Sequence, residues 1–148
     1  MMFDLIVKGG TLPDGTVADI GIAGGKITAI EARLEAEAAE VIDASGDLVS
    51  PPFVDPHFHM DATLSYGKPR LNASGTLLEG ISLWGELRDI ATVEEMVERA
   101  LTYCDWAASM GTLAIRSHVD TTPDHLNTVT AMLEVMEKVK EYIDLQLV

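Results

Sequence analysis

The stretch that decides the fold is Pro51-Pro52-Phe53-Val54-Asp55-Pro56-His57-Phe58-His59-Met60-Asp61. It predicts a short strand that ends in two histidines separated by one residue. Side chains at positions i and i+2 of an extended chain lie on the same face, so His57 and His59 should converge. Two neutral imidazoles placed in this way supply half of a divalent-metal site. Surface or core histidines without a metal can show the same spacing, so the rest of the chain has to decide.

Composition narrows the class of protein. The chain has 148 residues, 47% of them hydrophobic, and a net charge of -14, which argues against binding to nucleic acid. Cys104 is the only cysteine, so no disulfide can form within the chain and a reducing compartment is expected. The N-terminus does not resemble a signal peptide, and no apolar run reaches the ~18 residues of a membrane span. We therefore predict a cytoplasmic protein.

Residues 1–50 carry the signals of a β-rich segment. Strands are expected at residues 3–8, 17–23, 26–31, 41–43 and 47–49. Gly24-Gly25 suits a hairpin turn that requires positive φ. Residues 32–40 are predicted to form a loop, with a short helix as the alternative. So small a segment needs a partner to fold, and we expect it to be part of a composite β-sandwich.

From residue 51 onward, strands alternate with amphipathic helices. The connection 62–91 is unusually long, and its helical stretch 77–89 favours a pocket wall or lid. The apolar residues of that stretch are Leu77, Ile81, Trp84 and Leu87. Thr92 and Glu95 match a capping box, and Gly111 ends the helix that follows. That helix should bury Val93, Met96, Val97, Ala100, Leu101, Cys104 and Ala108 as a core face.

The strand expected at residues 112–119 has an apolar and a polar face. The apolar face carries Leu113, Ile115 and Val119, and the other carries Arg116, His118 and Asp120. A polar inner face is natural where a strand end opens into a site. Arg116 is expected to pair with Asp120 or Asp55, because an unpaired buried charge is very costly.

A last helix and strand are expected to follow. Thr122 should be the N-cap and Pro123 the first helical residue. The buried stripe should comprise Leu126, Val129, Leu133, Met136 and Val139. The strand 143–148 ends while still apolar, from which we expect the sequence to be a fragment of a longer protein.

Residues 51–148 therefore follow a β-α-β-α-β order, which predicts a parallel sheet with right-handed crossovers. A (β/α)8 TIM barrel takes about 250 residues, so this part could hold at most three of eight strands. A small open α/β sheet is the alternative. In both folds ligands collect at the carboxyl ends of the strands. Those ends carry His57, His59, His118 and Asp120.

The motifs resemble a known family. The glycine-rich β segment followed by the histidine stretch 51–61 is similar to the amidohydrolase superfamily. Two later stretches resemble its cytosine deaminase branch, and the resemblance covers nearly the whole chain. These stretches are Asn72-Ala73-Ser74-Gly75-Thr76-Leu77-Leu78-Glu79-Gly80-Ile81 and Arg116-Ser117-His118-Val119-Asp120.

The resemblance implies the N-terminal part of a metal-dependent TIM barrel, with a small β-sandwich made from both chain ends. His57 and His59 would ligate one divalent ion, Fe²⁺ or Zn²⁺. In the family a His after strand five and an Asp after strand eight complete the ligands, and a further His follows strand six. The catalytic acid-base Glu, next to the strand-five His, and a pyrimidine-orienting Gln after strand three are likewise expected beyond residue 148.

The implied reaction is hydrolytic deamination of cytosine to uracil and ammonia, by a homo-oligomeric parent enzyme acting on a pyrimidine or a related heterocycle. Isocytosine, a triazine or a cyclic amide are alternative substrates. An alternative of another class is a non-catalytic fragment or assembly module. No nucleic-acid or membrane partner is expected.

Other polar residues have two interpretations each. Asp61 could fix the tautomer of a ligating ring, or it could cap or hold a loop. His118 could line the pocket or be a structural histidine. Asn72 could touch substrate or cap its loop. Glu79 and Glu86 are interpreted as surface or cap residues.

Overall fold

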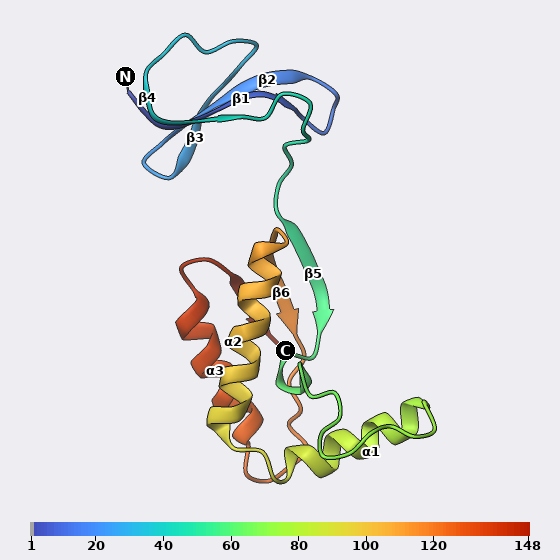
Figure 1. Ribbon diagram of the computed structural model, residues 1–148. Coiled ribbons are helices and arrows are strands. Elements are labelled where there is room, and N and C mark those ends of the chain that lie inside the picture. The colour runs from blue at the N-terminus through green and yellow to red at the C-terminus, as the bar shows by residue number, and fades with distance from the viewer. Residues whose placement is uncertain (1) are drawn as a thin grey trace. The chain divides into compact units, whose positions relative to one another are not determined.

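The computed structural model describes residues 2–148, which form two compact units (Figure 1). One unit ends at Pro51 and the other runs from Pro52 to Val148. Each unit has its own β-sheet, and we describe each by itself.

The first unit is a four-stranded sheet in the order β3-β2-β1-β4. β1 pairs antiparallel with β2 and parallel with β4, and β2 pairs antiparallel with β3. Gly24 and Gly25 both have positive φ, 58° and 71°, which confirms the predicted hairpin turn. The strands are β1 (Phe3–Thr11), β2 (Val17–Ala23), β3 (Lys26–Glu31) and β4 (Ala38–Asp43).

A small core and one buried carboxylate hold this sheet together. Phe3, Ile6 and Leu34 form the buried cluster. The carboxylate of Asp19 accepts hydrogen bonds from the amides of Leu34, at 2.9 Å, and Gly9, at 2.8 Å. These two bonds, that of Leu34 above all, lower the pKa of Asp19. One side chain of β2 is thereby tied to β1 and to the loop that precedes β4.

Two predictions for this unit were wrong. Residues 32–40 are not wholly a loop, because β4 begins at Ala38, where it pairs with Phe3 of β1. Residues 47–49 form no regular strand and contribute only a single bridge between Leu48 and Thr11. A turn in which the Asp47 amide donates to the Ala44 carbonyl changes the direction of the chain just before Leu48.

Large apolar side chains remain exposed in this unit, namely Val17, Ile27, Ile30, Val41, Ile42 and Leu48.

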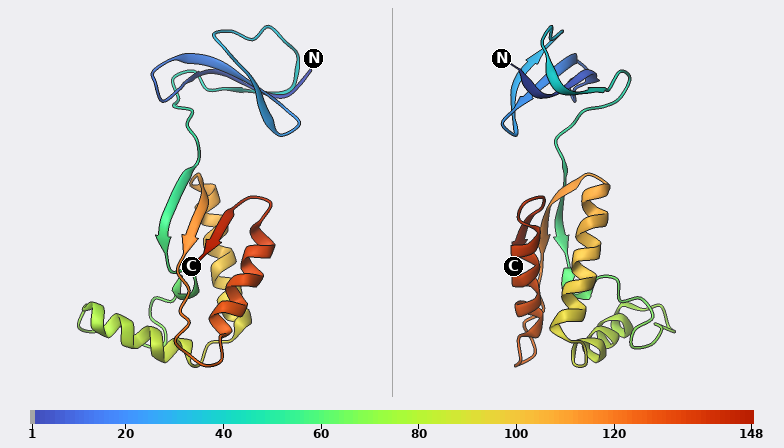
Figure 2. Two further views of the ribbon diagram at one scale, coloured as in Figure 1. Left: turned by 180° about the vertical axis from the view of Figure 1, so that it is seen from behind. Right: turned by 60° about the vertical axis from the view of Figure 1, so that its left-hand side comes forward.

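The second unit has the predicted parallel sheet, in the order β5-β6-β7. The helices α2 and α3 lie side by side and pack against this sheet (Figure 2). Its strands are β5 (Phe53–Phe58), β6 (Thr112–Ser117) and β7 (Asp144–Leu147). Its helices are the short η1 (Met60–Ala62), α1 (Leu77–Arg88), α2 (Val93–Ser109) and α3 (Asn127–Val139).

The core face predicted for α2 is confirmed. Met96, Ala100 and Cys104 are fully buried, and the capping box between Thr92 and Glu95 is present. The thiol of Cys104 is free and lies 3.8 Å from the sulfur of Met60. Burial raises the pKa of this thiol to about 11, so it stays protonated and inert at neutral pH.

The start and the buried face of α3 differ from the prediction. The helix begins at Asn127, after Leu126 with a left-handed φ of 45°. Thr122 does not cap it, because the helix starts five residues further along the chain. The Thr122 hydroxyl instead donates to the Asp120 carboxylate and accepts from Arg88, each at 2.6 Å. Leu133 is 50% exposed, since apolar residues occupy two adjoining faces of this helix and only one packs on the core. The buried residues are Thr128, Ala131, Met132, Val135 and Val139.

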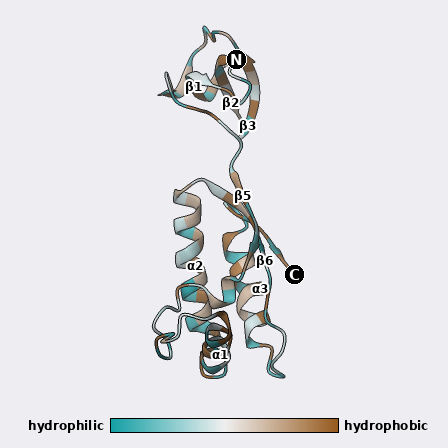
Figure 3. Cartoon of the chain, turned by 90° about the vertical axis from the view of Figure 1, so that its right-hand side faces the viewer, coloured by the Kyte–Doolittle hydropathy of each residue, from teal (hydrophilic) through white to brown (hydrophobic). Residues whose placement is uncertain are grey.

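The helix α1 mixes apolar and polar residues (Figure 3), and only some of its apolar side chains are buried. Leu83 and Leu87 are buried, whereas Leu77 and Ile81 are 78% and 57% exposed. Trp84 and Leu87 do line a small hollow of about 230 Å³, as a pocket wall would. Of the four apolar residues named for this helix, Leu77 and Ile81 do not line that hollow. Among residues 2–148, no helix is both long and apolar enough to cross a membrane.

The capping box gives a test of the second unit. Replacing Thr92 with Ala removes the acceptor for the Glu95 amide and should lower the free energy of unfolding by about 1 kcal/mol. The matched control is Thr102→Ala on the same helix, whose hydroxyl bonds only to the Glu98 carbonyl. Urea denaturation followed by circular dichroism at 222 nm reports on this unit, because the described helices all lie in it. Equal effects of the two substitutions would contradict the capping role.

Candidate metal centre

The carboxyl ends of β5 and β6 are joined by polar contacts beyond their last strand pair. The amide of His118 donates to the Phe58 carbonyl at 2.7 Å. The buried hydroxyl of Ser117 accepts from the amide of Met60 at 3.0 Å. These bonds fix the segment that carries the second histidine of the pair, because its two neighbours are both anchored to β6.

This pairing brings three imidazoles together. The ring centroids of His57 and His59 lie 5.5 Å apart, with the ring planes at 63°. His118 stacks on His57 at 4.0 Å and 25°, and lies 5.8 Å from His59. Burial and the two neighbouring imidazoles lower the pKa of His118, which favours its neutral form. Sequence spacing predicted the first two histidines as a pair, and the structure adds His118 to them.

The imidazoles of His57 and His59 provide part of the ligand set that a metal ion needs. Neutral imidazoles are ligands that zinc and iron both accept. In the part of the chain that the structure describes, however, no group of three or more His, Cys, Asp or Glu side chains is arranged to hold an ion. His57 and His59 can therefore supply two ligands, and further ligands would have to come from elsewhere.

Asp61, two residues after His59, holds a loop. Its side chain is buried, with 1% exposure. One carboxylate oxygen accepts from the Ala62 amide at 2.9 Å and the other from the Asp120 amide at 2.8 Å. Burial raises the pKa of this carboxyl although both amides oppose the shift. Of its two interpretations, the structure shows the loop contact, which joins the residues after β5 to those after β6.

Two arginines missed by the sequence reasoning secure this region. Arg88 at the end of α1 donates to the Asp120 carboxylate at 2.7 Å, and Trp84 donates to the same oxygen at 2.9 Å. Arg99 of α2 donates to the backbone carbonyls of Asp61, at 3.2 Å, and Thr63, at 3.0 Å. The spacing of Trp84 and Arg88, four residues apart on one helix face, was the available signal.

The partner predicted for Arg116 was therefore wrong. Its side chain is exposed and donates to the Gln146 amide oxygen at 2.7 Å. Burial by itself raises the pKa of Asp120, but hydrogen bonds from Thr122, Arg88 and Trp84 outweigh it and hold that pKa well below its ordinary value. Because Arg88 supplies the cation, Asp120 has no need of Arg116.

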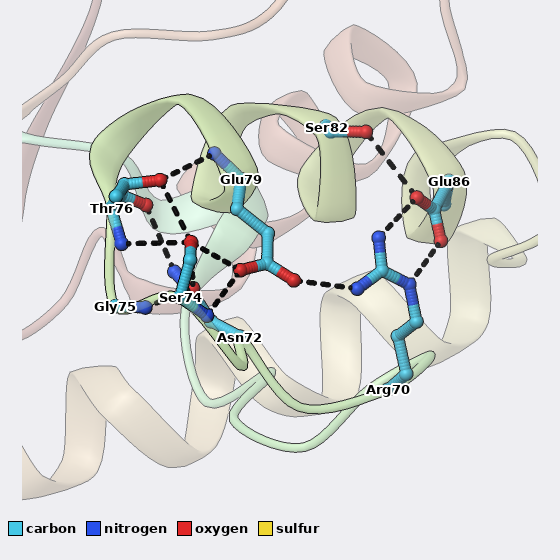
Figure 4. A network of polar contacts seen from close by, with 8 residues as sticks. All are labelled: Arg70, Asn72, Ser74, Gly75, Thr76, Glu79, Ser82 and Glu86. Atoms are coloured by element: carbon cyan, nitrogen blue, oxygen red, sulfur yellow. Dashed lines mark hydrogen bonds and ion pairs between the residues drawn. The ribbon is translucent and has the colours of Figure 1, made fainter.

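Asn72 belongs to a polar network that shapes the loop before α1 (Figure 4). The side-chain nitrogen of Asn72 donates to the Thr76 carbonyl at 3.0 Å, and its side-chain oxygen accepts from the backbone amide of Gly75 at 2.8 Å. Glu79 accepts from the Ser74 amide at 2.6 Å and from Arg70 at 2.8 Å. These contacts are those of loop capping, the second interpretation of Asn72.

Arg70 also binds Glu86 through two nitrogens, at 2.9 and 3.2 Å, so one guanidinium links two acids of α1. Glu79 and Glu86 thus act as cap and surface residues, as interpreted from the sequence.

Comparisons with known proteins agree with this architecture. Residues 40–139 match the family model described as Amidohydrolase family. The N-isopropylammelide isopropyl amidohydrolase of a Pseudomonas species is 35% identical over 99% of this chain. An allantoinase from Salmonella choleraesuis is 51% identical over 63 residues, 40% of this chain and 14% of its own length.

Among solved structures, 5-methylcytosine deaminase from Klebsiella pneumoniae liganded with phosphonocytosine is similar to this chain. The TM-score is 0.86 and the identity 36%, over 96% of this chain. The chain spans 38% of the Pseudomonas relative and 35% of the Klebsiella structure. The predicted fold class is confirmed, because the chain matches the N-terminal part of TIM-barrel enzymes.

The network around Glu79 gives a pH prediction. The Ser74 hydroxyl, the Ser74 amide and Arg70 together lower the pKa of Glu79 to about 2 from an ordinary 4.5. Because the pKa is lowered on folding, the network stabilises the loop above pH 4.5 and loses that contribution as the pH falls toward 2. Titration of the Glu79 carboxyl carbon by NMR should show this midpoint. Ser74→Ala should raise it, whereas Ser82→Ala, which touches only Glu86, should not.

Proposed function

This chain belongs to the amidohydrolase family, and we propose that it is the N-terminal part of a metal-dependent hydrolase that deaminates cytosine or a related amino-substituted ring. The observation that carries the proposal is the likeness to 5-methylcytosine deaminase over 96% of the chain. His57 and His59 at the end of β5 add donors of the right type.

The residues of this chain would bind and position the ion. The imidazoles of His57 and His59 would hold it, and a bound ion would supply the acidity that water needs for hydrolysis near neutral pH. Ser117 and Asp61 keep the histidine segment in place through the Met60 and Asp120 amides. The proton-transferring carboxylate is expected outside residues 1–148. Zinc and iron both suit imidazole donors.

A second candidate is hydrolysis of an alkylamino group on a triazine ring. The Pseudomonas relative named for N-isopropylammelide supports it, with 35% identity over 99% of this chain. The allantoinase match covers only 40% of the chain and lends less support to a cyclic amide.

The proposed parent enzyme is homo-oligomeric and cytoplasmic. The buried free thiol of Cys104 is consistent with a reducing compartment.

Metal binding tests the two ligands directly. Calorimetric titration of the chain with Zn²⁺ should show weak binding of one ion, and His57→Ala or His59→Ala should lower the affinity at least about tenfold. His125→Ala is the matched control, because His125 is exposed and contacts only the Asn127 amide. Unchanged affinity in the His57 and His59 variants would refute the assignment.

Activity separates the candidate substrates. The complete metal-loaded enzyme should release ammonia from cytosine or 5-methylcytosine and leave N-isopropylammelide intact, as followed by chromatography of the released amine. Release of isopropylamine would favour the triazine candidate. No release from any of the three compounds would refute both named substrates and leave isocytosine or a cyclic amide as the next compounds to assay.

A further inference from the structure

We propose that His118 is a positioning residue that holds the imidazole of His57, by ring stacking, in the orientation needed to bind a metal ion. This inference rests on the proposed function, because it concerns the same pair of histidines. Nothing in the spacing of the first two histidines requires a third ring.

The three ring pairs differ in kind. His57 and His118 are the closest pair, 4.0 Å between centroids, and the only one of the three that is stacked, at 25°. His57 and His59 meet edge to face, at 63°. His57 is an exposed residue, so free rotation about its side-chain bonds would have to be lost when it binds an ion. A stacked neighbour removes part of that rotation in advance and so improves affinity.

His118 can serve as a support because its own backbone is fixed on both sides. Its amide donates to the Phe58 carbonyl of β5 at 2.7 Å. The amide of the next residue, Val119, donates to the carbonyl of Val148 after β7 at 2.9 Å. The strand end that carries His118 is thus held between its two neighbours in the sheet.

The stacked geometry favours support over ligation. The lone pair of an imidazole nitrogen lies in the plane of the ring, and a zinc ion sits in that plane at about 2.0–2.1 Å. For two nearly parallel rings 4.0 Å apart, an ion in the plane of one lies well outside the plane of the other.

Substitution of His118 distinguishes stacking from ligation. His118→Phe keeps a flat ring but has no nitrogen, and His118→Ala removes the ring. Zn²⁺ affinity of the chain, measured by calorimetry, should fall about 10-fold or more in His118→Ala and stay within about threefold in His118→Phe. Equal losses in both variants would show that a nitrogen is needed and would overturn the proposal, as would an unchanged affinity in His118→Ala.

A metal-free measurement supports the same test. In the NMR spectrum of the chain without metal, the ring protons of His57 should shift in His118→Ala, because the ring current of the stacked neighbour is lost. They should keep their upfield position in His118→Phe. If the wild type shows no such stacking shift, the proposal fails whatever the affinities are.

The outcomes separate this inference from the proposed function. Unchanged Zn²⁺ affinity in His57→Ala would refute the metal site itself. Weakened binding in His57→Ala with unchanged binding in His118→Ala would refute the positioning role alone. If His118→Ala does not fold, judged by its helical circular dichroism, His118→Asn replaces it as the non-stacking variant.

Discussion

The hydrogen bond from the His118 amide to the Phe58 carbonyl, 2.7 Å long, is the contact on which the arrangement at the carboxyl ends of β5 and β6 depends. It continues the pairing of β5 and β6 to the very end of both strands, where Phe58 already faces Ser117. Because strand ends otherwise fray, a bond at this position holds His57 at the end of β5, and His59 just after it, next to the residues that follow β6. The Ser117 hydroxyl and the Asp61 carboxylate each add one contact. Together these three contacts form the junction between the ends of β5 and β6.

The junction concentrates negative charge, and the protein balances it locally. Asp61 and Asp120 lie close enough that the charge of Asp120 adds to the burial that raises the pKa of Asp61. Arg88 neutralises Asp120 from α1, and Arg99 donates to the backbone beside Asp61 from α2. In a chain of net charge -14 with only ten lysines and arginines, two arginines are committed to this junction. An ion pair thereby joins α1 to the segment after β6, and hydrogen bonds to backbone carbonyls join α2 to the segment after β5.

Periodicity and capping predicted the elements well, but not the partners of polar side chains. The buried face of α2 and the Thr92 capping box follow from local pattern, since each depends on residues a few positions apart. The parallel sheet followed from the alternating order of strands and helices. Arg88 and Asp120 lie 32 residues apart, so no local sequence pattern could show that Asp120 pairs with Arg88 and not with Arg116. Likewise, the local pattern that predicted Thr122 as the N-cap of α3 did not show that its hydroxyl would bond to Asp120 and to Arg88, 34 residues away. The stacking of His118 on His57 follows from strand register, which the sequence does not specify.

The burial of Cys104 has a practical consequence. Its sulfur lies against Met60, immediately after the histidine segment, and its raised pKa keeps it protonated. A thiol in this state reacts with alkylating reagents only when the surrounding core opens. Cys104 is the only cysteine of the chain, so the rate at which an alkylating reagent labels the protein measures how often the core around Met60 opens. The measurement needs no engineered cysteine.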